Sequence, residues 1–162
     1  EGEVHTGSAQ TKREEWAFVV EDEIGRNISY QLQYIEFLTR LYNEYQLYLT
    51  YESLLCKNIM VSVCAIAEAG LFSIISNARA KGGLTGEWRT DFTALLGSAH
   101  NEYFLIDDEV WMYFHELRKL RNTLHIQSAD FLEHKGYNTL RANEAITMLE
   151  KLRVQLVGES VS

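Results

Sequence analysis

The sequence of 162 residues contains no proline. Proline breaks helices, and a chain of this length would usually carry several, so its absence favours long uninterrupted helices. Alternation of apolar and polar residues, the pattern of a half-buried strand, nowhere continues for more than four residues. No internal repeat is visible, and the length suits a single domain. The sequence therefore predicts an all-α protein.

Cysteine is scarce as well, with only Cys56 and Cys64 in the chain. On one helix, eight positions apart, their Cα atoms would be separated by roughly 12 Å. A disulfide between them is excluded at that distance. Neither residue belongs to a zinc-binding spacing with histidine, and no glycine-rich phosphate loop is present. We expect no metal and no cofactor, and two free thiols fit a reducing, cytoplasmic setting.

Basic side chains are few, since 15 Lys and Arg stand against 23 Asp and Glu, for a net charge of −8. General nucleic-acid binding is disfavoured, because neutralisation of phosphates supplies most of the affinity in such proteins. The charge is unevenly distributed, however. Residues 1–112 carry 8 basic and 17 acidic side chains, whereas residues 113–155 carry 7 basic and 5 acidic ones. This distribution leaves room for one local basic site. The given sequence does not open with a basic stretch followed by an apolar one, so no secretory signal is visible.

Apolar residues recur at helical spacing in several segments. We expect residues 1–12 to form a flexible tail and residues 13–158 to form one domain, an antiparallel up-and-down bundle of four to six helices. The expected helices are a short one within Lys12–Ile24, then Ile28–Leu49, Tyr51–Ala80, one capped by Asp91 that ends at Leu96, one from about 107 to 125, and Leu140–Val157. Breaks are expected at Gly25 with Arg26-Asn27, at residues 81–86 and at Gly97-Ser98.

The segment from Ile59 to Ile75 is apolar on all sides except at Ser62, Glu68 and Ser73. With about 17 residues and an ionised side chain near its middle it is a poor membrane span. We interpret it as a core helix and expect no membrane contact. A buried carboxylate needs a partner, so Glu68 is expected to pair with Arg118 or Arg121. The alternative is that Glu68 lies at the edge of the bundle and reaches water.

Five tyrosines lie between residues 30 and 48, on the expected helix Ile28–Leu49. An aromatic stripe at this spacing is usually core or a helix–helix interface, and a platform for stacking nucleic-acid bases is the less common alternative. Together with the apolar helix Ile59–Ile75, it offers more apolar surface than a monomer of this size readily covers. We therefore expect a homodimer.

The strongest candidate site is the helical stretch from Tyr113 to Ile126. Leu117, Leu120 and Leu124 recur on one side, and Arg118, Arg121 and His125 follow the same spacing beside them. Two guanidinium groups and one imidazole on one strip can bind a phosphate and transfer a proton. The simpler alternative is a solvated basic face beside a core stripe. Other residues are set aside: His115 lies on nearly the opposite side, and Tyr113, His100 and His134 have no supporting context.

The stretch Leu-Arg-Lys-Leu-Arg-Asn-Thr-Leu-His-Ile, residues 117–126, resembles the signature of the HEPN superfamily. That signature is an Arg followed four to six residues later by His, often with Asn directly after the Arg. In this chain six residues separate Arg118 from His125, whereas Asn122 follows Arg121. The order of segments is also similar, with a long apolar helix carrying Glu68 before the motif and an amphipathic helix after it. The resemblance covers residues from about 28 to 157.

The resemblance implies a small helical bundle and, for many HEPN proteins, a metal-independent endoribonuclease of toxin–antitoxin or antiviral-defence systems. Such proteins usually act as dimers in which two Arg/His motifs meet. For this chain it implies RNA as substrate, a homodimer and an antitoxin or defence-system partner. Arg118, Arg121, Asn122 and His125, here named the arginine–histidine strip, would be catalytic, with Glu68 in support.

Within the strip, Arg121 is expected to contribute more than Arg118, because it adjoins Asn122 and lies one helical turn from His125. Other HEPN proteins have lost catalysis and serve as binding or scaffolding modules. The alternative for this chain is therefore a dimerisation or binding module. In it, Glu68, Arg118, Arg121 and His125 would form a buried polar network that fixes the register of the helices.

Overall fold

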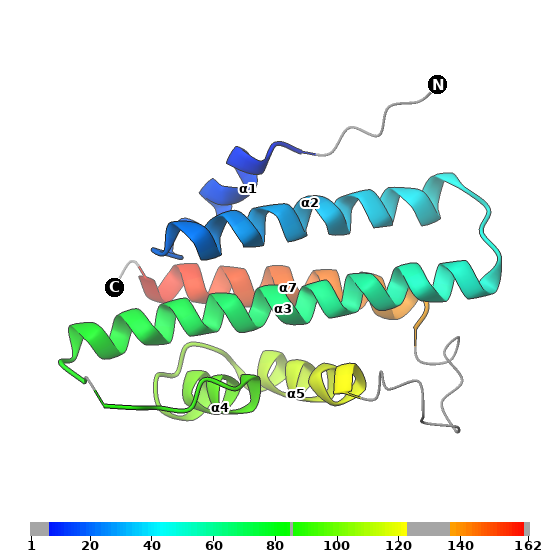
Figure 1. Cartoon of the computed structure of the whole chain (residues 1–162). Coiled ribbons are helices and arrows are strands. Elements are labelled where there is room, and N and C mark those ends of the chain that lie inside the picture. Colours follow the sequence, from blue (N-terminus) through cyan, green and yellow to red (C-terminus); the bar gives the residue numbers. More distant parts are fainter. Residues whose placement is uncertain (1–6, 85, 123–136, 161–162) are drawn as a thin grey trace.

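The computed structural model describes residues 7–84, 86–122 and 137–160. Within these ranges the regular structure consists of six α-helices and no strand. The helices, labelled as in Figure 1, are α1 (Ala9–Glu15), α2 (Asp22–Glu44), α3 (Leu49–Lys81), α4 (Phe92–Asn101), α5 (Asp108–Asn122) and α7 (Thr139–Ser160). The prediction of an all-α, up-and-down bundle is confirmed.

The helix α3 is at the centre of the bundle and packs against α2, α4, α5 and α7. Figure 1 shows α3 and α7 running in one direction and α2 and α5 in the other. The short helix α1 lies against α2, and α4 packs against α3 and α5. The end of α5, the start of α7 and the α2–α3 connection all lie at the same end of the bundle.

Burial confirms the interpretation of Ile59–Ile75 as the core segment of α3. Its inward-facing residues have almost no exposed surface, among them Ile59, Val63, Ile66, Leu71 and Ile75. By length and composition alone α3 could cross a membrane, but 67% of its most apolar window is buried within the bundle. Because this segment is covered inside the fold, it does not supply the free apolar surface that the expected homodimer was partly based on.

The prediction of a flexible tail over residues 1–12 is wrong where α1 begins at Ala9. The Ser8 hydroxyl caps this helix by accepting a hydrogen bond of 3.1 Å from the Thr11 amide. Lys12 then forms an ion pair of 2.9 Å with Glu36 on α2. None of the residues of α1 is buried, so its sequence shows no periodic pattern of apolar residues. The helix becomes apparent only from its polar contacts in the folded chain.

The expected break at Gly25 is also wrong, because α2 runs from Asp22 through Gly25 and Arg26-Asn27 without interruption. A Cβ atom at Gly25 would lie 2.4 Å from the guanidinium carbon of Arg13. Arg13 in turn donates hydrogen bonds to the carbonyl oxygens of Trp16 and Val19, at 3.1 and 2.9 Å. Gly25 therefore makes room for the Arg13 guanidinium rather than ending a helix.

Asp91 caps α4 as expected, since its carboxylate accepts a hydrogen bond from the Ala94 amide. The expected break at Gly97-Ser98 is wrong, because α4 continues through both residues to Asn101. Asn138 caps α7 by accepting a bond of 3.0 Å from the Arg141 amide. The expected extension of α5 from 123 to 125 falls outside the described residues.

A close contact between Gly70 and Trp16 joins the N-terminal segment to α3. A Cβ atom at Gly70 would lie 2.8 Å from the Trp16 ring, which is buried. Gly70→Ala should therefore lower the free energy of unfolding by about 1–3 kcal/mol, as overpacking does. Gly97→Ala is the matched control, because nothing lies within 4 Å of its added Cβ, and it should raise stability by about 0.5–1 kcal/mol. Urea unfolding of both variants tests this, and equal effects would contradict it.

The connection from α4 to α5 contains a histidine–carboxylate pair. The Nε2 atom of His100 lies 2.7 Å from Asp108 Oδ1, and its Nδ1 lies 3.0 Å from Asn101 Oδ1. The His100 ring also stacks on Trp111, with 5.2 Å between centroids. The hydrogen bond to Asp108, followed by that to Asn101, raises the pKa of His100. The pair thus ties the end of α4 to the start of α5.

A raised folded-state pKa makes this tie sensitive to pH. Its contribution is fully present below the ordinary histidine pKa of 6.5 and is lost as the pH rises through the higher folded-state value. Asp108→Asn should therefore lower the melting temperature more at pH 5.5 than at pH 8.5. Loss of the acidic side chain from the first turn of α5 is common to both measurements, so the difference between them reports on the contact with His100. The same difference at both pH values would contradict the assignment.

Candidate functional site

The helix α5, which carries the strip, is anchored at its N-terminal end. The Asp107 carboxylate caps it by accepting a hydrogen bond of 2.8 Å from the Val110 amide. From α7, Lys151 contacts both Asp107, at 3.3 Å, and Glu109. Val110 and Phe114 are completely buried. These contacts hold the N-terminal half of α5 against the core and α7, and the strip follows in its C-terminal half.

Arg121 is the strip residue that α3 holds directly. Its Nη1 donates a hydrogen bond of 2.9 Å to Glu68 Oε2, which confirms the predicted pairing of Glu68. Its guanidinium carbon also lies 5.8 Å from the centroid of the Phe92 ring on α4. Both partners of the ion pair keep about 30% of their side-chain exposure. The pair therefore lies at the margin of the core. Glu68 is paired with an arginine, as expected, and it also reaches water, as the alternative for this residue stated.

Arg118 has a different environment, although it lies one helical turn from Arg121. The residue is partly buried, and its Nε atom is buried without a hydrogen-bond partner in the part of the chain that the structure describes. No ion pair joins Arg118 to Glu68 there. Glu68 thus pairs with Arg121 and not with Arg118, and the Nε atom of Arg118 is left with an unused hydrogen-bond donor among the described residues.

The remaining strip residues are only partly described. Asn122 is the last residue of α5. His125 lies outside the described residues, and so does His134. His115 stacks on Trp111, with 5.3 Å between centroids, which agrees with setting it aside. The structure therefore joins Arg121 to Glu68, gives Arg118 a separate environment, and leaves the histidine of the strip as a sequence-based prediction.

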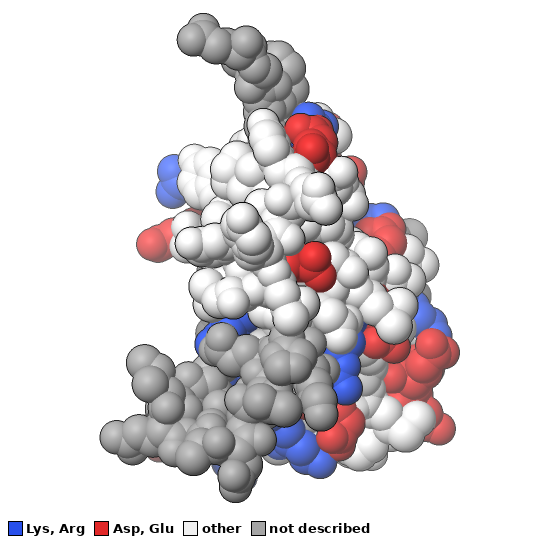
Figure 2. Space-filling model, turned by 90° about the vertical axis from the view of Figure 1, so that its right-hand side faces the viewer, with Lys and Arg blue, Asp and Glu red and all other residues white. Residues whose placement is uncertain are grey.

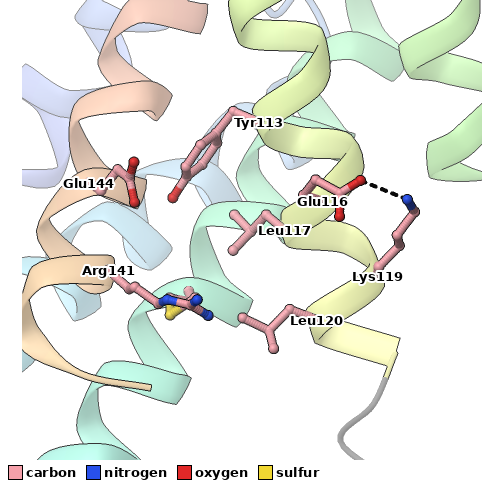
Figure 3. Close-up of a pocket in the computed structure, with 8 residues that line it drawn as sticks. Tyr113, Glu116, Leu117, Lys119, Leu120, Arg141 and Glu144 are labelled. Carbon is pink, nitrogen blue, oxygen red and sulfur yellow. Dashed lines mark hydrogen bonds and ion pairs between the residues drawn. The ribbon is translucent and has the colours of Figure 1, made fainter. Parts of the chain in front are cut away.

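A groove of about 430 Å³ lies between α5 and α7, over α3. Figure 3 shows Leu117 and Leu120 of α5 facing into it, with Arg141 and Glu144 of α7 on the other side. Met60 of α3 also lines it. On the outer side, Glu116 pairs with Lys119 at 2.6 Å. The groove combines an apolar lining with charged groups of both signs, and its volume is in the range of small-ligand sites.

Tyr113 directs its hydroxyl group across this groove toward α7 (Figure 3). Burial of the phenol raises its pKa, and the nearby Glu144 carboxylate raises it further. The hydroxyl is therefore neutral at physiological pH and can donate or accept a hydrogen bond. Sequence reasoning set Tyr113 aside and missed Arg141 and Glu144. The only available signal was the spacing of three between the last two, which places them on one polar side of α7.

Other reactive groups do not form a site in the described part of the chain. Both thiols are buried, and burial raises the pKa of Cys56 to about 11 and that of Cys64 to about 12. Thiols with such values are poor nucleophiles near neutral pH. Among the described residues, no three His, Cys, Asp or Glu side chains come together in a way that could hold a metal ion.

Comparisons of the chain with protein-family models, with curated proteins and with solved structures found no match. The likeness to the HEPN superfamily is therefore a prediction that rests on the strip and on the order of the helices.

The ion pair between Glu68 and Arg121 has a measurable effect on stability. Glu68→Gln removes the carboxylate charge and leaves the guanidinium without its partner, so the free energy of unfolding should fall by about 1 kcal/mol. Partial exposure keeps the loss below the ~3–5 kcal/mol seen when fully buried pairs are broken. Glu116→Gln, which removes an exposed ion pair within α5, is the matched control and should leave stability unchanged. If Glu68→Gln has no larger effect than the control, the pair is not structural.

Proposed function

We propose that this chain is a metal-independent endoribonuclease of the HEPN type, acting through the arginine–histidine strip. The supporting observation is the buried Nε donor of Arg118, which has no hydrogen-bond partner among the described residues, beside the anchored Arg121 in a chain whose overall charge is −8. The proposal includes the setting that the resemblance implies. The protein would be a cytoplasmic toxin or antiviral-defence effector, would act on RNA as a homodimer, and would be regulated by a partner protein.

The chemistry requires no metal. The 2′-hydroxyl of RNA attacks the adjacent phosphorus, the bond to the 5′-oxygen of the next nucleotide breaks, and a 2′,3′-cyclic phosphate forms. One proton leaves the 2′-hydroxyl and another must reach the departing oxygen. The imidazole of His125 is suited to such a transfer, because its ordinary pKa lies near neutrality. A guanidinium stabilises the additional negative charge on the phosphorus-centred transition state.

The two arginines would have different tasks in this mechanism. Glu68 compensates the charge of Arg121 and fixes its orientation, so Arg121 would mainly position the strip. Arg118 forms no ion pair with Glu68, and its Nε donor is unused among the described residues, so it would be the better phosphate ligand. This assignment reverses the sequence-based expectation that Arg121 contributes more. The reversal follows from the ion pair alone, which spacing along one helix does not show.

The groove between α5 and α7 would hold an unpaired base next to the strip. Leu117 and Leu120 belong to α5, as Arg118 and Arg121 do, and line this groove. An apolar lining with a few hydrogen-bonding groups suits a base that has left the stack, and sequence-specific RNA recognition mostly uses such bases. The Tyr113 hydroxyl and the Glu144 carboxylate would meet its polar edge. The preferred substrate would then be single-stranded RNA.

A non-catalytic dimerisation or binding module is the second candidate, and one observation favours it. The ion pair of 2.9 Å between Arg121 and Glu68 joins α5 to α3, as a network that fixes helix register would. In this alternative the chain binds no RNA, and the strip matters only for stability.

Cleavage of mixed RNA in the presence of EDTA separates the two candidates. We expect cleavage with 2′,3′-cyclic phosphate ends, abolished by His125→Ala without loss of the fold. Arg118→Ala should lower the rate on the order of 10²-fold, as expected for a lost transition-state donor, and Arg121→Ala should lower it less. Arg26→Ala is the matched control, because Arg26 forms an exposed ion pair with Asp22 far from the strip. Its rate should equal that of the wild type.

Tyr113→Phe tests the groove separately from the strip. Loss of the hydroxyl should raise KM severalfold and leave kcat nearly unchanged, because the base is bound in the ground state and the transition state alike.

A requirement for added Mg²⁺, or activity that survives His125→Ala, would contradict the mechanism. Absence of both cleavage and RNA binding, in a folded protein, would leave the binding-module alternative.

A further inference from the structure

The connection between α2 and α3 carries an exposed apolar surface, here named the hairpin tip. It consists of Tyr45, Tyr48, Leu49, Tyr51 and Leu54, which are 55%, 82%, 61%, 61% and 40% exposed. No charged residue occurs from Tyr45 to Tyr51, and Glu44 and Glu52 flank this segment. Figure 2, which faces this end of the bundle, shows that its upper part is largely uncharged.

The hairpin tip combines a hollow with a projection. A groove of about 480 Å³ is lined only by leucine and tyrosine, namely Leu41, Tyr45, Leu47, Tyr51, Leu54 and Leu55. Tyr48 and Leu49 are not part of this lining. They lie next to it in the chain and project into solvent. One short segment therefore presents both an apolar receptor surface and the apolar side chains that could fill one.

We propose that the hairpin tip binds a second copy of this chain, with Tyr48 and Leu49 of each copy seated in the groove of the other. A two-fold interface pairs the same surface with itself, so projection and hollow must occur together on that surface. A lipid surface would need only the projecting side chains. A net charge of −8 would in addition be repelled by anionic lipids.

The exposed area is sufficient for a weak dimer. Taking about 200 Å² for a fully exposed tyrosine, the three tyrosines offer on the order of 400 Å² per copy. With the two leucines added, a pair of copies would bury roughly 1,000 Å², near the lower limit for a specific interface. The dimer should therefore dissociate on dilution. Added salt should strengthen it, because it screens the repulsion between two acidic copies. The inference does not rest on RNA cleavage and survives if that proposal fails.

Sedimentation equilibrium of the full chain tests the surface. The wild type should approach twice its mass of 18.7 kDa at tens of micromolar, and Tyr48→Glu should weaken association at least tenfold. Phe104→Glu and Tyr30→Glu are matched controls, since both remove aromatic rings that are exposed outside the hairpin tip, at 77% and 58%. They should associate as the wild type does. A wild type that remains monomeric at several hundred micromolar, or a control that weakens association equally, would overturn the proposal.

Disulfide trapping tests the geometry. Single variants Tyr48→Cys and Leu54→Cys, mixed and oxidised, should form the mixed dimer faster than Tyr48→Cys mixed with Phe104→Cys. The native thiols do not compete, because both are buried. Equal rates would contradict the proposed seating. Wild-type protein that floats with phosphatidylcholine vesicles while staying monomeric in solution would instead assign the hairpin tip to a lipid surface.

Discussion

The bundle depends on the burial of α3 on nearly every side. Between Lys57 and Arg79 this helix has a single charged residue, Glu68, so its remaining surface has to be covered by apolar neighbours. The α2, α4, α5 and α7 helices provide that cover. Without this constraint α4 and α5 would have no reason to fold back beneath α3. The order of the helices in space follows from the need to exclude water from one long apolar segment.

Glu68 converts that general constraint into a specific one. A carboxylate in an apolar helix is tolerated when a cation reaches it, and Arg121 does so from the last turn of α5. The pair sets how α5 is rotated about its own axis. That rotation turns Leu117 and Leu120 toward the groove (Figure 3) and leaves the Nε atom of Arg118 without a hydrogen-bond partner among the described residues. A stabilising contact thus gives the two arginines different environments.

Much of this arrangement could be predicted from the sequence, because apolar period identifies long helices well. The core segment Ile59–Ile75, the cap at Asp91 and the pairing of Glu68 were all predictable from local patterns. The helix α1 was not, since it buries no residue and shows no apolar period. Gly25 and Gly97 were read as breaks because a glycine in a helix is usually unfavourable. Their surroundings, a guanidinium at one and open space at the other, exist only in the folded chain.

The candidate site also has a part that local sequence patterns predict and a part that only the folded chain shows. Spacing along one helix placed Arg118 and Arg121 together, but only the packing of α5 against α3 shows that they differ. The groove combines residues more than 80 positions apart, from Met60 to Glu144, and no local pattern connects them. The hairpin tip was hidden for a related reason. A run of tyrosines and leucines is typical of a core, and the tight connection between two helices is what turns these side chains outward.

The glycines that receive Arg13 and Trp16 have a consequence for how the molecule opens. A seven-residue helix is too short to be stable alone, so α1 depends on its contacts with the bundle, among them the Arg13 guanidinium at Gly25 and the Trp16 ring at Gly70. This segment can detach without disturbing the contacts among α3, α5 and α7. Its amide hydrogens would then exchange with solvent through a local opening, at a lower free energy than those of α3. Each such opening would uncover the surface of α3 beside Gly70, which the Trp16 ring covers in the folded chain.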